Sequence, residues 1–84
     1  MRPYAIYINE AALVFAPNSG KQREHLIDFI RSLAQQPNTH GDFSEKDEVN
    51  RTVQVKIIDR YAVTFWADHA VMEIKITHIR PADQ

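Results

Sequence analysis

The stretch that decides the fold is VQVKIIDRYAVTFW, residues 53–66. Its first half alternates between apolar and polar residues, which places two valines and Ile57 on one face of a strand and Lys56 on the other. A two-residue joint, Asp59-Arg60, suits a tight hairpin, and a second β-prone run follows it. The stretch therefore predicts two antiparallel strands, and the partners of Lys56 decide whether its face is a site or only solvated.

The size and composition of the chain fit one domain over residues 1–84. There is no cysteine, which excludes disulfides and cysteine-bound metals and fits a reducing cytosol. The N-terminus lacks the apolar run of a signal peptide, and no segment approaches the roughly 20 apolar residues of a membrane span. We therefore expect a cytoplasmic protein with no membrane partner. Ten basic and eleven acidic residues give a net charge of −1, so nucleic-acid binding requires the basic residues to cluster.

The N-terminal half predicts one strand and two helices. Residues 4–8 are short and β-prone, and the following EAALVFA, residues 10–16, reads as a short helix, although its apolar part could instead extend the strand. A longer helix follows, with Ser19 and Gln22 at the spacing of a capping box and Pro37 at its end. Its apolar residues recur with the helical period, so one side of this helix is expected to be buried.

The C-terminal half predicts a polar connection and three strands. Residues 37–51 are polar, with Phe43 as the expected anchor to the core, and a loop of this length is often functional or mobile. Strands are expected at 52–58, 61–66 and 71–79, because each is rich in β-branched and aromatic residues.

The order of elements is thus β-α-α-β-β-β, an α+β fold. The last three strands form an antiparallel sheet that the first strand joins, and both helices pack on one face of it. The opposite face stays open, and we expect Lys56 to lie there.

Several local motifs occur together with this order. Leu33 and Pro37 form an L-x-x-x-P helix end, Gly41-Asp42 lies in the polar connection, V-x-V-K ends at Lys56, and the chain closes on I-x-x-I-x-x-A-D. In this ordered set the chain resembles the RelE/ParE superfamily of small bacterial toxins, over almost its whole length.

The resemblance implies the toxin of a type II toxin–antitoxin pair, with a cognate antitoxin that wraps and neutralises it. One branch of the superfamily is a ribosome-dependent endoribonuclease that cuts mRNA without a metal and so stops translation. The other main branch inhibits DNA gyrase without being an enzyme. A third possibility is a toxin fold that has lost activity and only binds an antitoxin-like partner. No cofactor is implied by any of the three.

Four residues are catalytic candidates for metal-independent RNA cutting, which needs a base, an acid and cations around the phosphate. Lys56 matches the family's site lysine in the second strand, and Arg80 lies close to the family's phosphate-binding arginine. His78 would share a face with Arg80, and an imidazole can serve as acid or base. Arg60 precedes the hairpin aromatic, where the family has an arginine after it, and could substitute. For each, the alternative is an ordinary surface side chain.

Four more residues are candidate RNA contacts. Arg51 and Lys75 could bind phosphate, although solvated charge explains them equally, and Trp66 and Tyr61 could stack on bases, although both could instead be packing aromatics. The acidic residues and His40 of the polar connection have the spacing of neither a calcium nor a zinc site, so no metal is expected.

Overall fold

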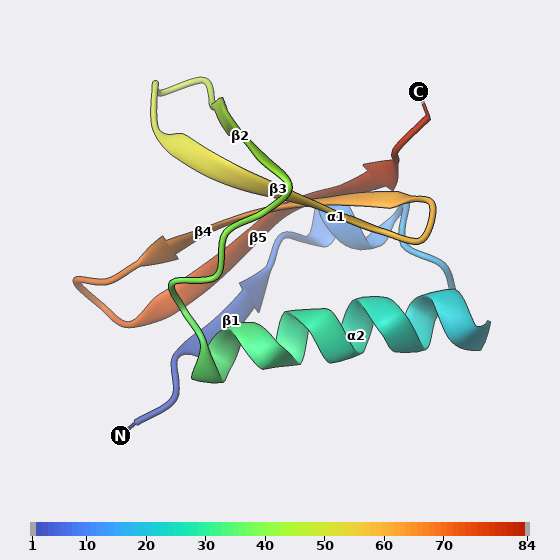
Figure 1. Ribbon diagram of the computed structural model, residues 1–84, viewed down its shortest axis with the longest axis horizontal. Helices are drawn as coiled ribbons and strands as arrows, with labels where there is room; N and C mark the ends of the chain where they lie inside the picture. Colours follow the sequence, from blue (N-terminus) through green and yellow to red (C-terminus); the bar gives the residue numbers. More distant parts are fainter. Residues whose placement is uncertain (1, 84) are drawn as a thin grey trace.

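The structure, a computed structural model, describes residues 2–83. Within them it has five strands and two helices, in an order that Figure 1 follows from blue to red. The elements are β1 Ala5–Ile8, α1 Glu10–Leu13, α2 Gly20–Gln35, β2 Phe43–Lys46, β3 Thr52–Ile58, β4 Tyr61–Asp68 and β5 Glu73–Pro81. The α+β class and the C-terminal three-stranded meander are confirmed. No helix in this range is long and apolar enough to cross a membrane.

The strands form one sheet in the order β1-β5-β4-β3-β2. Neighbours from β2 to β5 are antiparallel, whereas β1 runs parallel to β5, so the sheet is mixed and not purely antiparallel as expected. β1 and β5 lie at opposite ends of the chain and no hairpin joins them, so their pairing is not restricted to the antiparallel direction.

β2 is a strand that the sequence pattern did not predict. It lies inside the presumed loop and pairs antiparallel with β3, from Phe43 opposite Val55 to Lys46 opposite Thr52. All four of its residues are exposed, and Phe43 is 48% exposed, so its expected role as a core anchor is wrong. The strand is held through its backbone at the sheet edge, and its side chains therefore carry no burial signal.

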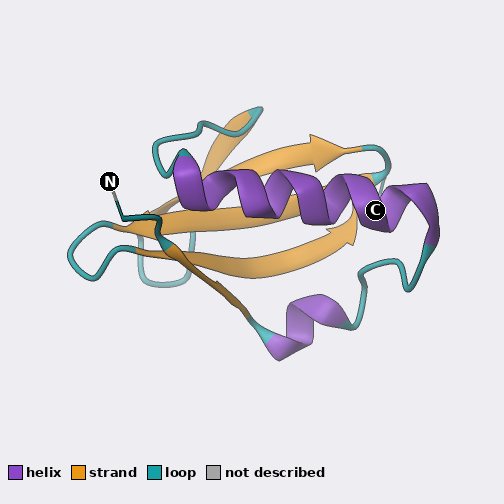
Figure 2. Cartoon of the chain, turned by 90° about the horizontal axis from the view of Figure 1, so that it is seen from below, coloured by secondary structure: helices purple, strands orange, loops and turns teal. Residues whose placement is uncertain are grey.

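The hydrophobic core lies between α2 and the sheet, and Figure 2 shows α2 lying across one sheet face. The helix contributes Leu26, Ile30 and Leu33, each 4% exposed or less, as its helical period predicts. Burying one such side chain contributes roughly 1.5–3 kcal/mol. The buried sheet residues of this core are Val63, Phe65, Ile74, Ile76 and Ile79.

The two helices start with different caps, and only the start of α2 differs from the expected capping. Asn9 caps α1, because its side-chain oxygen accepts the N–H of Ala11 at 2.9 Å. Ser19 lies at the N-cap of α2 but makes no side-chain cap bond, so the predicted capping box is wrong. The next residue, Gly20, has φ +87°, far from the helical backbone that a capping box requires.

Each of the two hairpins of the meander contains a residue with positive φ in its turn. The joint Asp59-Arg60 is confirmed, since β3 ends at Ile58 and β4 begins at Tyr61, with φ 54° at Asp59. The second hairpin turns two residues later than predicted, because β4 continues as far as Asp68, which pairs with Glu73. The polar ends of both strands thus pair by backbone bonds that hydrophobic alternation does not reveal.

Candidate functional site

The strand register decides which face of the sheet each candidate occupies. Lys56 pairs with Val63, which belongs to the helix-side core, whereas Val55 pairs with Thr64 on the opposite face. Paired residues project to the same side of a sheet, so the expectation that Lys56 lies on the open face is wrong. Val53 and Val55 are buried on the side away from α2, and alternation alone does not tell which side the helix covers.

On the helix side, Lys56 forms an ion pair with Asp42, in the segment that connects α2 to β2. Its Nζ lies 3.2 Å from Oδ1 of Asp42, and Oδ2 of Asp42 accepts the backbone N–H of Ile57 at 2.8 Å. The hydrogen bond from Ile57, followed by that from Lys56, lowers the pKa of Asp42 below its usual 3.8. The Lys56 ammonium therefore anchors this connection to β3.

His78 and Arg80 do lie together on the open face. Arg80 pairs with Ala62 and His78 with Thr64, so both project to the side opposite Val63 and the core. A bulge between Thr64 and Phe65 leaves Thr77 as an extra residue of β5, and its hydroxyl lies 3.1 Å from Nδ1 of His78. The two side chains line a shallow pocket of about 160 Å³ that reaches Glu45 and Val53.

Arg60 and Tyr61 lie away from this pocket. Arg60 is in the β3–β4 hairpin loop, where its carbonyl accepts the N–H of Ala82 at 2.8 Å. Tyr61 is half-buried, pairs with Pro81 and packs against the helix-side core. Neither residue shares the face of His78, because the hairpin loop lies at one end of the sheet and Tyr61 alternates to the other side.

The other three RNA-contact candidates meet on the open face, in an arrangement we call the cation–aromatic row. The guanidinium carbon of Arg51 lies 3.9 Å from the ring centroid of Trp66. Trp66 pairs with Lys75, and the Nζ of Lys75 lies 5.0 Å from the ring centroid of Tyr7, its partner on β1. The row, made of Arg51, Trp66, Lys75 and Tyr7, thus runs from the residue before β3 across β4 and β5 to β1, with cations and aromatic rings in alternation.

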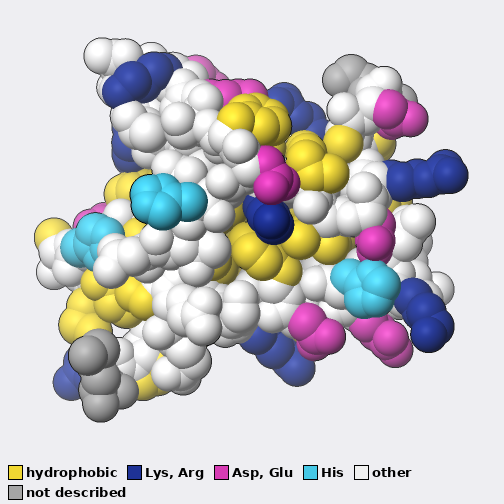
Figure 3. All heavy atoms as spheres, in the orientation of Figure 1, with side chains coloured by type: hydrophobic (Ala, Val, Ile, Leu, Met, Phe, Trp, Pro, Cys, Tyr) yellow, Lys and Arg dark blue, Asp and Glu magenta, His cyan; other side chains and the backbone are white. Residues whose placement is uncertain are grey.

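Carboxylates accompany the cations of this face. The closest contacts are 2.9 Å from Arg51 to Asp47, 2.7 Å from Lys75 to Glu73 and 3.9 Å from Arg80 to Glu45. Hydrogen bonding to Glu73 raises the pKa of Lys75, and the backbone N–H of Arg51 is the main cause of a lowered pKa of Asp47. Figure 3 shows the same mixture of both charges on the side of the molecule that it presents.

Three residues of the open face were missed by sequence reasoning: Tyr7, Thr64 and Glu45. Tyr7 was visible as an alternating position of the first strand, opposite the apolar Ile6 and Ile8. Glu45 was hidden because β2 was taken as loop. Thr64 is 5% exposed, and only the register places it beneath the two side chains of the pocket.

Comparisons with known proteins give one clear likeness. No protein-family model matches the sequence, and no curated protein matches it. Among solved structures, the chain is similar to a chain of the archaeal RelE-RelB complex from Pyrococcus horikoshii OT3, with a TM-score of 0.77 over 98% of both chains. The identity is 14%, so the likeness is one of fold. The chain has a RelE-like fold.

Proposed function

We propose that this chain is the toxin of a toxin–antitoxin pair and that its open face binds and cuts mRNA on the ribosome. The observation that carries the proposal is the placement of His78 and Arg80 side by side over the buried Thr64, on the face that α2 leaves uncovered. The RelE-like fold supports it, because the similar solved chain belongs to a RelE-RelB complex.

The proposed chemistry is attack by a ribose 2′-oxygen on the adjacent phosphate. His78 takes the 2′-hydroxyl proton, the new oxygen–phosphorus bond forms, and the bond to the 5′-oxygen breaks as that oxygen gains a proton from water. Arg80 donates to the phosphate oxygens, on which negative charge increases in the transition state. Both side chains are exposed, as a site for a macromolecular substrate requires.

The cation–aromatic row would hold the RNA strand beside this centre. The pair Trp66–Lys75 follows the pair Thr64–His78 on the open face of β4 and β5. The row therefore extends the same face as the proposed reactive centre. Aromatic rings stack on bases and cations contact phosphates, which together bind single strands without strict sequence preference. A chain with a net charge of −1 needs such a local arrangement to bind RNA.

An antitoxin is the expected protein partner. Leu13, Val14 and Phe15, at and just after the end of α1, are 48%, 75% and 60% exposed. Contiguous exposed apolar residues of this kind mark a protein contact more often than a solvated surface. An apolar antitoxin segment over this patch would bury it.

Primer extension on a reporter mRNA in a bacterial translation extract tests the activity. The unmodified chain is expected to produce cuts inside translated codons, and Arg80→Gln to reduce them by about 100-fold. Arg31→Gln is the matched control, because Arg31 is exposed on α2 and the charge change is the same. An intact mRNA at saturating protein would refute the nuclease proposal.

A gyrase inhibitor is the second candidate. The carboxylate partners of Arg51, Lys75 and Arg80 favour it, since a charge-balanced face suits a protein partner better than a polyanion. A DNA supercoiling assay with purified gyrase separates the two: inhibition together with intact mRNA would assign the chain to this class.

A further inference from the structure

A large hollow of the described chain lies between the two hairpins. β3 and β4 pair only as far as Gln54 and Phe65, and beyond that point the β2–β3 and β4–β5 hairpins diverge, as Figure 1 shows. The diverging strands leave a cleft of about 560 Å³, which the connection at residues 37–40 closes on a third side. This volume is typical of small-molecule sites.

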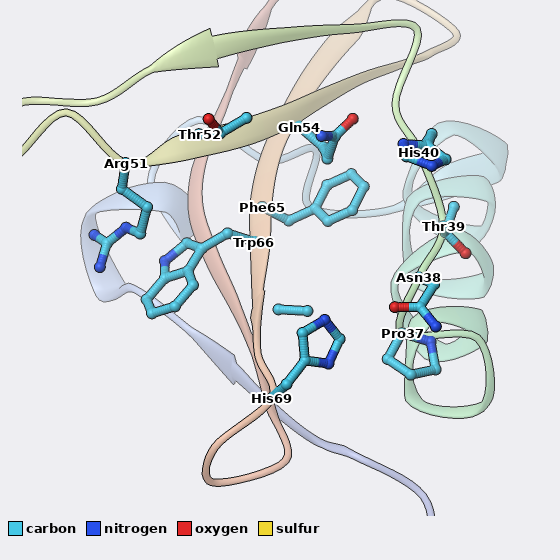
Figure 4. Close-up of a pocket in the computed structure, with 11 residues that line it drawn as sticks. Pro37, Asn38, Thr39, His40, Arg51, Thr52, Gln54, Phe65, Trp66 and His69 are labelled. Carbon is cyan, nitrogen blue, oxygen red and sulfur yellow. The ribbon is translucent and has the colours of Figure 1, made fainter.

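One end of the cleft is formed by a cation–π pair. The guanidinium of Arg51 lies over the indole of Trp66, and Figure 4 shows the pair at one end of the cleft. Asp47 fixes the guanidinium through Nε at 2.9 Å and is not itself among the lining residues. A guanidinium over an indole ring offers a cationic surface for a further aromatic ring.

The other walls offer hydrogen-bonding groups. Gln54 uses its Oε1 to accept the N–H of Gly41 at 2.9 Å, which leaves its amide NH₂ as donor. His69 is held by the hydroxyl of Tyr4, 2.7 Å from its Nδ1, so Nε2 is the atom presented to a ligand. Figure 4 places His40 and Asn38 on the opposite wall.

The lining residues of the described cleft include no carboxylate. This absence distinguishes it from the pocket at Arg80, where Glu45, Asp47 and Glu48 are among the lining residues. An arginine, two imidazoles, amides and hydroxyls around an aromatic floor suit a ligand that combines a flat ring with negative charge.

We propose that this cleft binds one nucleotide unit, a nucleobase together with its phosphate. The base stacks on the Arg51–Trp66 pair, the amides of Gln54 and Asn38 contact its edge, and the imidazoles of His40 and His69 donate to the phosphate. The cleft opens beside the cation–aromatic row, because Arg51 and Trp66 belong to both. In mRNA cutting it would hold an unpaired nucleotide next to the cut strand, and in that role it rests on the proposed function.

Trp66 is the one tryptophan of the sequence, so its fluorescence reports on this cleft directly. The purified chain is titrated with AMP, adenosine, ribose 5-phosphate and the oligoribonucleotide hexaadenylate, with no ribosome present. We expect saturable quenching by AMP and hexaadenylate, and binding at least about tenfold weaker for adenosine and ribose 5-phosphate, which each lack one half of the ligand. Tighter binding of hexaadenylate than of AMP supports an RNA strand as the source, and equal binding supports a free nucleotide.

Arg51→Gln tests the cation–π pair, with Arg31→Gln on α2 as the control of equal charge. We expect Arg51→Gln to weaken AMP binding by about tenfold or more, and Arg31→Gln to leave it unchanged. Nuclear magnetic resonance of the unmodified chain gives a second readout, in which AMP shifts the backbone amides of Thr39, Thr52 and Ala67. Absence of both saturable quenching and these shifts would overturn the proposal, whatever the result of the mRNA assay.

Discussion

The backbone of Gly41 lies directly against the backbone of Val55. A Cβ built on Gly41 would be 2.7 Å from both the nitrogen and the carbonyl carbon of Val55, closer than side chains are found in proteins. The next residue, Asp42, donates its N–H to the carbonyl of Val55 at 2.8 Å. This approach joins the connection after α2 to β3, and it therefore fixes one wall of the cleft and the start of β2.

Gly41→Ala is expected to destabilise the fold. The opposing atoms are backbone and cannot rotate away, so the added methyl must displace β3 or the connection, at a cost of about 2–3 kcal/mol. Gly20→Ala is the comparison, because Gly20 has positive φ but nothing within 4 Å of a Cβ, and its cost of about 1 kcal/mol is conformational only. Urea denaturation measures both, and an equal loss for the two variants would contradict the steric account.

The stability of the chain should fall at acid pH through Asp42. Its lowered pKa means that the folded state favours the carboxylate, so the stabilisation is present above pH 3.8 and is lost as the pH falls through the folded pKa. Asp42→Asn cannot titrate, so its urea midpoint should vary less than that of the unmodified chain between about pH 5 and pH 2. Asp28→Asn, exposed on α2, should keep the full dependence.

The two sheet faces can be distinguished by paired substitutions. Lys56→Gln removes a cation on the helix side and should leave mRNA cutting within about twofold, whereas Arg80→Gln on the open face should lower it about 100-fold. Primer extension measures both variants in one extract. A loss of cutting in Lys56→Gln with an unchanged urea midpoint would place the reactive face on the helix side instead.

The alternation in residues 53–66 was enough to predict the central hairpin, because hydrophobic period and turn residues agree there. It was not enough to place Lys56. Val53 and Val55 are buried on the face opposite α2, so burial of the valines does not identify the face that the helix covers. Which face α2 covers depends on packing between segments that are distant in the sequence. β2 was not predicted for a related reason, because an exposed edge strand has no buried face and so shows no alternation of apolar and polar residues.

The cation–aromatic row depends on a feature that alternation cannot predict. Trp66 pairs with Lys75 only because the bulge at Thr64 and Phe65 shifts the register by one residue. Without it Trp66 would oppose Ile76, and Lys75 would project to the other face. Arg51, Trp66 and Lys75 could therefore be predicted from the sequence as candidate RNA contacts. Their placement on one face of the sheet could not be predicted.

The carboxylate beside Arg80 should restrain RNA binding. Glu45 lies 3.9 Å from the guanidinium, and both side chains are largely exposed, so the pair is weak and an RNA phosphate competes with the carboxylate for the same cation. Glu45→Gln removes the competitor, and we expect hexaadenylate to bind about twofold to fivefold more tightly. Glu24→Gln on α2 makes the same change in net charge and should have a smaller effect. Because a purely global charge effect would raise both affinities equally, fluorescence titration of the two variants decides whether Arg80 contacts RNA locally.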